Sequence, residues 1–303
     1  MLKEYIIEVF EPTLLFGLLC SLIGLSAAIY YGHASIYLGI IAIIGVITTQ
    51  IAVNLIDDYV DYNVGIDKET KKTKFSGGSE LIASKKLSTR GILGIAIMAL
   101  FISLLIGIYI LQFLSIYVIG AMIGLILFGG IVTIFYAKYL THVPYFSEPL
   151  VTIAFAMVGL GVFIVATNSI VNSYFVFLFV CIPSGLQVGV AMIANELPDK
   201  EVDKKYGRRN IIIMLSENKK ASGLYFLFQG IGYLLIGYGI IEHILPITFL
   251  IMFTLIPLMY IIGTNIEKYK NPKQHEKTMG LNALAAFSYI FFISLAFIIG
   301  VFL

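Results

Sequence analysis

The sequence predicts an all-α, polytopic membrane protein with nine transmembrane helices. Hydrophobic residues make up 59% of the 303 residues and charged residues only 13%, and the mean hydropathy is +0.95. Soluble domains carry about 25% charged residues, so a soluble protein is excluded. Two further observations support the prediction. Apolar runs recur at the length of about 20 residues that crosses a bilayer, and the cations are confined to alternate connections.

The nine predicted spans are recognised by the length of their apolar runs. Each run is apolar throughout, so no amphipathic period is available as evidence. They cover 13–31, 37–57, 92–112, 115–135, 149–167, 173–195, 222–241, 244–264 and 281–302.

The connections within successive pairs of spans lack positive charge. These are 32–36, 113–114, 168–172 and 242–243, and none contains Lys or Arg. All 20 Lys and Arg lie in five other segments: Lys3, seven from Lys68 to Arg90, Lys138, seven from Lys200 to Lys220, and four from Lys268 to Lys277. Positive residues collect on the cytoplasmic side. We therefore expect a multi-pass cell-membrane protein with a cytoplasmic N-terminus and an external C-terminus; eight or ten spans would break the segregation.

Function is expected at the cytoplasmic face. The two long connections, about 62–91 and 196–221, both lie there, and long loops carry function more often than short ones. Both clusters of aspartates lie at this face as well.

The first cluster begins where the second predicted span ends. Asn54, Asp58 and Asp61 are spaced i, i+4 and i+7, which places them on one helical face. Asp57 lies one position off that stripe, so either Asp57 or Asp61 can be the main second ligand.

The second cluster ends the sixth predicted span in the same manner. Asn195, Asp199 and Asp203 are spaced i, i+4 and i+8, again on one face. Pro198 lies within this stretch, where it either kinks the helix or marks a restart.

These two faces predict one divalent-metal site assembled from both halves of the chain. Carboxylates that border a membrane core are costly and usually functional. Carboxylate and amide oxygens are the ligands that Mg²⁺ prefers, often completed by substrate phosphates. Two opposed faces would hold two Mg²⁺ ions. The alternative is that both clusters are solvated helix ends. It does not explain why both begin with the same Asn-x₃-Asp pattern.

Basic and aromatic residues near the clusters are further candidates. Lys74, Lys138, Arg208 and Arg209 are candidate phosphate-binding residues, although topology alone also accounts for cations in these loops. Tyr136 is either an interfacial anchor or a ring that stabilises a cation in the site. Glu148 precedes Pro149 and is interpreted as a cap of the following helix.

At these residues the chain resembles the UbiA superfamily of intramembrane prenyltransferases. The resemblance rests on Asn54-x₂-Asp57-Asp58-Tyr59-x-Asp61-Tyr62-x₂-Gly65-x-Asp67 and on Asn195-Glu196-x-Pro198-Asp199-x-Glu201-x-Asp203-x₃-Gly207-Arg208-Arg209. Both are most similar to the MenA branch, which prenylates dihydroxynaphthoate. Three segments depart from the family pattern: Glu11-Pro12 replaces an Arg-Pro pair, Asp57 replaces Asn, and Gly207-Arg208-Arg209-Asn210 replaces a Gly-Lys-Arg-Thr tail.

The resemblance implies a helical bundle around a central cavity, Mg²⁺ as cofactor and a polyprenyl diphosphate as donor. Asp58, Asp61, Asp199, Asp203 and Tyr136 would be catalytic, with Asn54, Asp57 and Asn195 as further metal ligands. The acceptor is expected to be a small aromatic quinone precursor, with a glycerol lipid as an alternative. Residues 1–303 would form one domain with motif-bearing halves at about 1–140 and 141–303.

Two other expectations complete the prediction. An ion-coupled secondary transporter is the rival from a different class, but transporters bind near the midplane and these acids lie at one edge. The partners expected are the donor, the acceptor and the lipid bilayer. No nucleic-acid partner is expected.

Overall fold

The computed structural model describes residues 2–9, 11–32, 34–70, 82, 84, 86–215 and 220–303, and within these ranges every regular element is a helix. The long helical segments are α2 (Leu14–Tyr30), α3 (Ile36–Val64), α6 (Thr89–Leu111), α7 (Ile116–Phe135), α8 (Ser147–Thr167), α12 (Lys220–Ile241) and α14 (Pro272–Gly300). Two others are composite: α9 (Ser173–Val176), η2 (Phe177–Cys181) and α10 (Ile182–Lys205), then η3 (Ile247–Leu255), α13 (Ile256–Asn265) and η4 (Ile266–Lys270). Four short elements are α1 (Leu2–Val9), α4 (Ile66–Glu69), η1 (Leu140–His142) and α11 (Ile211–Met214).

This architecture confirms the prediction of an all-α polytopic membrane protein. Eight helical segments in the described residues are long and apolar enough to span a membrane. The segment α2 has 17 residues and falls just below that length. The number nine therefore stays a prediction.

The two helices that carry the aspartate clusters are longer than predicted. Helix α3 continues past residue 57 to Val64, and α10 continues past residue 195 to Lys205. Pro198 lies inside α10 and does not end it. Both clusters consequently belong to the last turns of rigid helices and not to loops, so their one-face spacing is preserved in the fold.

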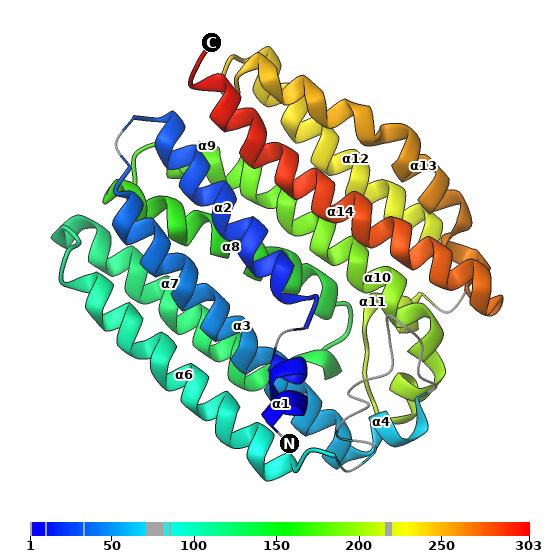
Figure 1. The fold of residues 1–303 in the computed structure, drawn as a ribbon. Coiled ribbons are helices and arrows are strands. Elements are labelled where there is room, and N and C mark those ends of the chain that lie inside the picture. Colours follow the sequence, from blue (N-terminus) through cyan, green and yellow to red (C-terminus); the bar gives the residue numbers. More distant parts are fainter. Residues whose placement is uncertain are drawn as a thin grey trace.

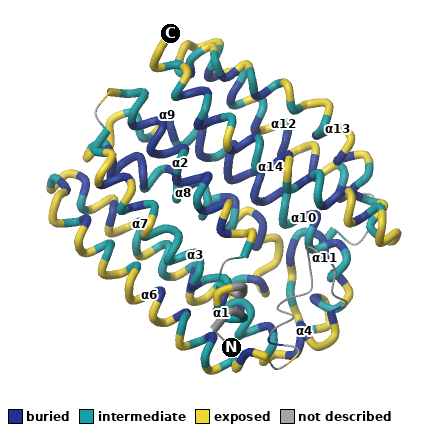
Figure 2. Tube along the Cα trace, in the orientation of Figure 1, coloured by how far each residue is buried: buried dark blue, intermediate teal, exposed yellow. Residues whose placement is uncertain are grey.

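The core lies among four segments, and the outer helices face lipid. Helix α2 packs on α8 and α14, and α10 packs on α8 and α12, while α6 packs on α3. Figure 2 shows buried residues concentrated along α2, α8, α10 and α14, with exposed positions along α6. In their most apolar stretches, 17% of α6 residues are buried against 72% in Ser173–Lys205. Apolar yet unburied helices need a lipid environment.

One end of the bundle collects the features that position the site. In Figure 1 the N-terminus, α1 and α4 lie at the end opposite the C-terminus. Both motif helices stop there on a glycine in the left-handed region, Gly65 with φ +106° and Gly207 with φ +87°. Glycine adopts this conformation without the steric cost that a Cβ brings, so each helix can end directly after its aspartates.

Candidate functional site

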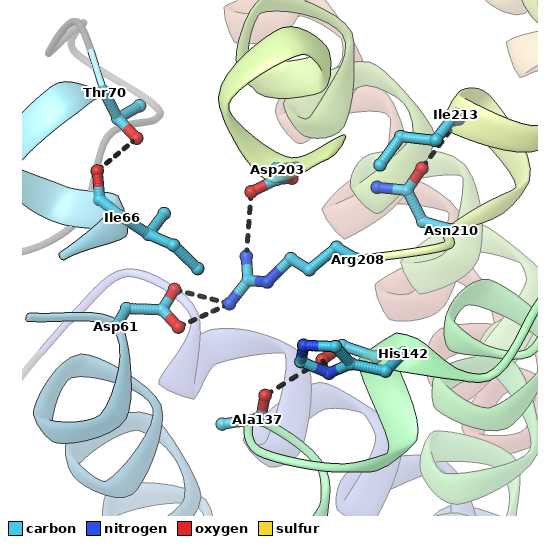
Figure 3. A network of polar contacts seen from close by, with 10 residues as sticks. Asp61, Ile66, Thr70, Ala137, His142, Asp203, Arg208, Asn210 and Ile213 are labelled. Carbon is cyan, nitrogen blue, oxygen red and sulfur yellow. Dashed lines mark hydrogen bonds and ion pairs between the residues drawn. The ribbon is translucent and has the colours of Figure 1, made fainter. Parts of the chain in front are cut away.

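The ends of α3 and α10 are joined by the side chain of Arg208. Its Nη2 lies 2.5 Å from both carboxylate oxygens of Asp61, and its Nη1 lies 3.2 Å from Oδ1 of Asp203. Figure 3 shows the guanidinium reaching between Asp61 on α3 and Asp203 on α10. A planar guanidinium carries several N–H donors in a fixed plane, which lets one side chain pair with two carboxylates. One cation therefore links the two motifs that the chain keeps far apart.

The environment of this ion-pair network is largely dry. The side chains of Arg208, Asp61 and Asp203 are 15%, 11% and 4% exposed. Burial opposes the charge of Arg208, but the carboxylates of Asp61, Asp57 and Asp203 outweigh it and raise the pKa of the guanidinium above its ordinary value. Arg208 thus stays cationic, and removing one partner would leave a buried charge uncompensated.

A second contact joins the same two helix ends at the surface. Lys205 donates to both oxygens of Glu69 on α4, at 2.7 and 2.6 Å, and the Tyr206 hydroxyl donates to Glu69 at 2.8 Å. Hydrogen bonds from Lys205 and Tyr206 lower the pKa of Glu69. The Tyr206 hydroxyl also lies 3.1 Å from where a Cβ on Gly65 would stand. The turn after the first cluster is therefore fitted to the end of the second.

The remaining oxygen-bearing residues of the clusters differ in their surroundings. Asp57 lies near Asp61 and Arg208, and Asp199 lies near Asp203 and Arg208, because these charges act on both carboxyls. Oδ1 of Asp57 and Oδ1 of Asn195 are buried without a hydrogen bond to any described residue. Such orphaned oxygens are candidate metal ligands. Asp58 is half-buried on the same helix.

Asn54 is engaged elsewhere. Its Nδ2 donates to Thr13 Oγ1 at 2.7 Å, and its Oδ1 accepts from Gln50 Nε2 at 3.0 Å. The structure thus ties Asn54 to the residue that precedes α2. Its carbonyl oxygen has a second lone pair that a metal could use.

Tyr136 sits at the end of α7 and faces the acidic residues. Burial, then the charges of Glu196 and Asp57, raise its pKa well above the ordinary value. Its phenol is therefore neutral at any working pH. This position fits the role of a ring in the site better than that of an interfacial anchor.

The predicted phosphate-binding residues are not equivalent in the structure. Arg208 lies in the cluster. Lys138 is exposed, with its ammonium 5.2 Å from the ring centroid of Tyr139, and the Arg209 side chain is exposed as well. Lys74 lies outside the described residues.

Glu148 has a different role from the one expected from the sequence. It is fully buried in the first turn of α8 but does not cap that helix. Its Oε1 instead accepts from the backbone N–H of Ile211, three residues after Arg208, at 2.8 Å. Its carboxyl also acts on that of Glu196. Sequence reasoning singled out neither carboxyl as a site residue, although an acid directly before a predicted apolar span, such as Glu148, was a usable signal.

A metal site built from the two clusters would require acidic side chains that converge on one point. Within the described ranges, no three His, Cys, Asp or Glu side chains converge as a metal site requires. The donor set nevertheless fits a hard cation, because it consists of carboxylate and amide oxygens. Two of those carboxylates, Asp61 and Asp203, are held by Arg208.

Comparison with known proteins places this site in a family. A model of the UbiA prenyltransferase family matches residues 13–298. The chain belongs to the UbiA prenyltransferase family. The match includes both aspartate clusters and the Arg208 turn that joins them.

The chain is also similar to one curated protein. It is the 1,4-dihydroxy-2-naphthoate octaprenyltransferase of Bacillus subtilis (strain 168), 27% identical over 199 residues. The match covers 64% of this chain and 60% of the relative, which is less than two thirds of its length.

Solved structures share the fold at low identity. The apo structure of a UbiA homologue from Aeropyrum pernix K1 has a TM-score of 0.71 at 13% identity, covering 95% of this chain and 97% of that one. A structure of digeranylgeranylglyceryl phosphate synthase has a TM-score of 0.61 at 19% identity, covering 99% and 98%. A UbiA homologue from Archaeoglobus fulgidus, bound to GPP and Mg²⁺, has a TM-score of 0.50 at 14% identity, covering 91% and 96%.

Proposed function

We propose that this protein is a Mg²⁺-dependent intramembrane prenyltransferase. It transfers a polyprenyl group from an allylic diphosphate to an aromatic acceptor, a quinone precursor such as dihydroxynaphthoate. The observation that carries the proposal is the convergence of Asp61 and Asp203 on Arg208 at one end of a lipid-embedded bundle.

The comparisons support both substrates of this reaction. The Bacillus subtilis relative is a dihydroxynaphthoate octaprenyltransferase, which favours an aromatic acceptor. The Archaeoglobus fulgidus fold relative binds GPP and Mg²⁺. A membrane setting suits a reaction whose donor and product are both lipids.

The metal ligands would come from both helices. Asp57, Asp58 and Asp61 with Asn54 on one side, and Asn195, Asp199 and Asp203 on the other, offer hard oxygen ligands for two Mg²⁺ ions. When bound, Mg²⁺ neutralises negative charge on the diphosphate leaving group. Asp57 Oδ1 and Asn195 Oδ1 are buried and accept no hydrogen bond from a described residue, so they are available for this role.

The chain's own cations and aromatic ring complete the mechanism. Arg208 and Arg209, with Lys74 and Lys138, would bind the diphosphate oxygens, because a guanidinium or ammonium stabilises the charge that develops as the carbon–oxygen bond breaks. The ring of Tyr136 would face the allylic cation, which cation–π attraction stabilises. The packed helices exclude water, so the acceptor carbon attacks the cation before hydrolysis can.

The site is proposed to open on the cytoplasmic side. The described Lys and Arg residues belong to elements that meet at the end opposite the C-terminus, the end of α1 and α4. Positive residues are retained on the cytoplasmic side. The C-terminus would then be external.

A product screen tests the proposal. Purified protein is incubated with Mg²⁺, donors of several chain lengths and a panel of aromatic and glycerol-lipid acceptors, and products are detected by mass spectrometry. We expect a prenylated aromatic product and release of diphosphate, both lost on chelation. A prenylated glycerol lipid alone would refute the acceptor class, and absence of diphosphate release with every pair would refute prenyl transfer.

A further inference from the structure

The turn that carries Arg208 is held by a second segment of the chain, Thr141–Glu148. Arg209 N–H donates to the carbonyl of Thr141 at 2.9 Å, and Tyr145 N–H donates to the carbonyl of Arg209 at 3.0 Å. On the other side of Arg208, the ring of His142 lies 3.4 Å from where a Cβ on Gly207 would stand. The backbone around Arg208 therefore lies against the connection between α7 and α8.

Glu148 contributes a charged side chain to this contact. The residue is 0% exposed, and its Oε1 accepts from Ile211 N–H at 2.8 Å. Its other oxygen, Oε2, is buried as well. What this contact requires is an oxygen at the right distance from Ile211, which a carboxylate or an amide of the same length can supply.

The backbone that follows Arg208 is thus held at two points. Thr141 and Tyr145 hold it at Arg209, and Glu148 holds it two residues further on at Ile211. The Arg208 side chain extends to Asp61 and Asp203 (Figure 3). These hydrogen bonds depend on the orientation of the guanidinium, so a small shift of this backbone would misplace it.

We propose that Glu148 is a positioning residue, which holds the Ile211 backbone so that Arg208 is aimed between the two aspartate clusters. The proposal rests on the proposed function for its kinetic consequences. Its structural content is separate: losing the Glu148 contact should resemble losing Arg208 itself, even when no substrate is present.

Two conservative variants separate position from charge. E148Q keeps the length of the side chain and an oxygen that accepts from Ile211. E148D keeps the charge but withdraws the oxygen by about 1.5 Å, the length of one carbon–carbon bond. R208A is the reference. T248V is the matched control. Thr248 lies on η3, away from the Arg208 turn, and donates one interhelix hydrogen bond to the carbonyl of Ala296 at 2.7 Å.

The first measurement needs no substrate. Purified variants are titrated with Mn²⁺, and the free ion is followed by electron paramagnetic resonance. Since R208A removes a positive charge that pairs with two carboxylates, it should tighten Mn²⁺ binding about tenfold. We expect E148D to shift the Mn²⁺ affinity in the same direction by about fivefold, and E148Q and T248V to stay within about twofold of the wild type. The double variant E148D/R208A should bind Mn²⁺ with the same affinity as R208A alone.

The second measurement is the KM of the diphosphate donor, which should rise in E148D and R208A and not in E148Q. The proposal is overturned if E148D binds Mn²⁺ like the wild type, if E148Q is the impaired variant, or if the effects of E148D and R208A multiply. Absence of prenyl transfer in the wild type would refute the proposed function and leave the Mn²⁺ comparison as the test of Glu148.

Discussion

Arg208 pairs through Nη2 with both carboxylate oxygens of Asp61, 147 residues away in the chain. The same guanidinium contacts Asp203. A guanidinium so close to these carboxylates repels a divalent cation that approaches them. Arg208 therefore competes with divalent cations for two of the proposed ligands.

This competition predicts an unusual gain of metal affinity. R208A should bind Mn²⁺ about tenfold more tightly than the wild type when no diphosphate is present, because the competing positive charge is gone. The metal-free variant should lose about 3 kcal/mol of stability, since buried carboxylates lose their counter-ion. Electron paramagnetic resonance and thermal unfolding with and without Mn²⁺ measure both effects. R209A is the control for affinity, and weaker Mn²⁺ binding in R208A would contradict the prediction.

Asp199 and Glu201 offer a matched pair on helix α10. Asp199 lies near Asp203 and Arg208, whereas Glu201 is exposed. We expect D199A to lower kcat about a hundredfold or more through loss of a metal ligand, and E201A to remain close to the wild type. Steady-state turnover with saturating Mg²⁺ measures the difference. Equal activity of the two variants would contradict the role of Asp199 as a metal ligand.

Tyr136 is expected to act through its ring. Burial and neighbouring carboxylates raise its pKa well above the usual value, so the phenol is protonated throughout the working range. Y136F should keep most of the turnover and the same pH profile, while Y136L should lose about tenfold in kcat because the cation loses its π partner. If the kcat of the wild type fell at alkaline pH and that of Y136F did not, the hydroxyl and not the ring would be the acting group.

Gly65 is expected to be intolerant of a side chain. It has φ +106°, and a Cβ there would stand 3.1 Å from the Tyr206 hydroxyl. G65A should therefore cost about 1 to 2 kcal/mol of stability. G94A is the control, because Gly94 lies inside helix α6, where an added Cβ would have no neighbouring atom within 4 Å. Thermal unfolding in detergent should show a lower midpoint for G65A alone.

The orientation in the membrane can be read by labelling. Lys138 and Glu242 are both exposed and lie at opposite ends of the bundle by the helix order. In a background in which the buried Cys20 and Cys181 are replaced by Ala, E242C should react with a membrane-impermeant maleimide in intact cells. K138C should react only after the cells are permeabilised. The reverse pattern would place the site outside.

Much of the architecture was predictable because the bilayer acts on local sequence. Hydrocarbon thickness sets the length of α6, α7 and α8, which lie within a few residues of their predicted ranges. Helical period put Asn195, Asp199 and Asp203 on one face, since that depends on spacing within a single helix. The ends of α3 and α10 were placed too early, because polar residues there continue the helix until Gly65 and Gly207 end it.

The sequence by itself determined that this is a helical membrane protein with two acidic helix ends, for these properties follow from hydropathy, spacing and charge along the chain. Only the tertiary structure decided which cation serves both ends. Arg208, Arg209 and Lys138 are alike as charges, but of these three described residues Arg208 is the one that forms ion pairs with Asp61 on α3 and Asp203 on α10. The same applies to Glu148, because its partner Ile211 lies 63 residues away and no local pattern links positions so distant.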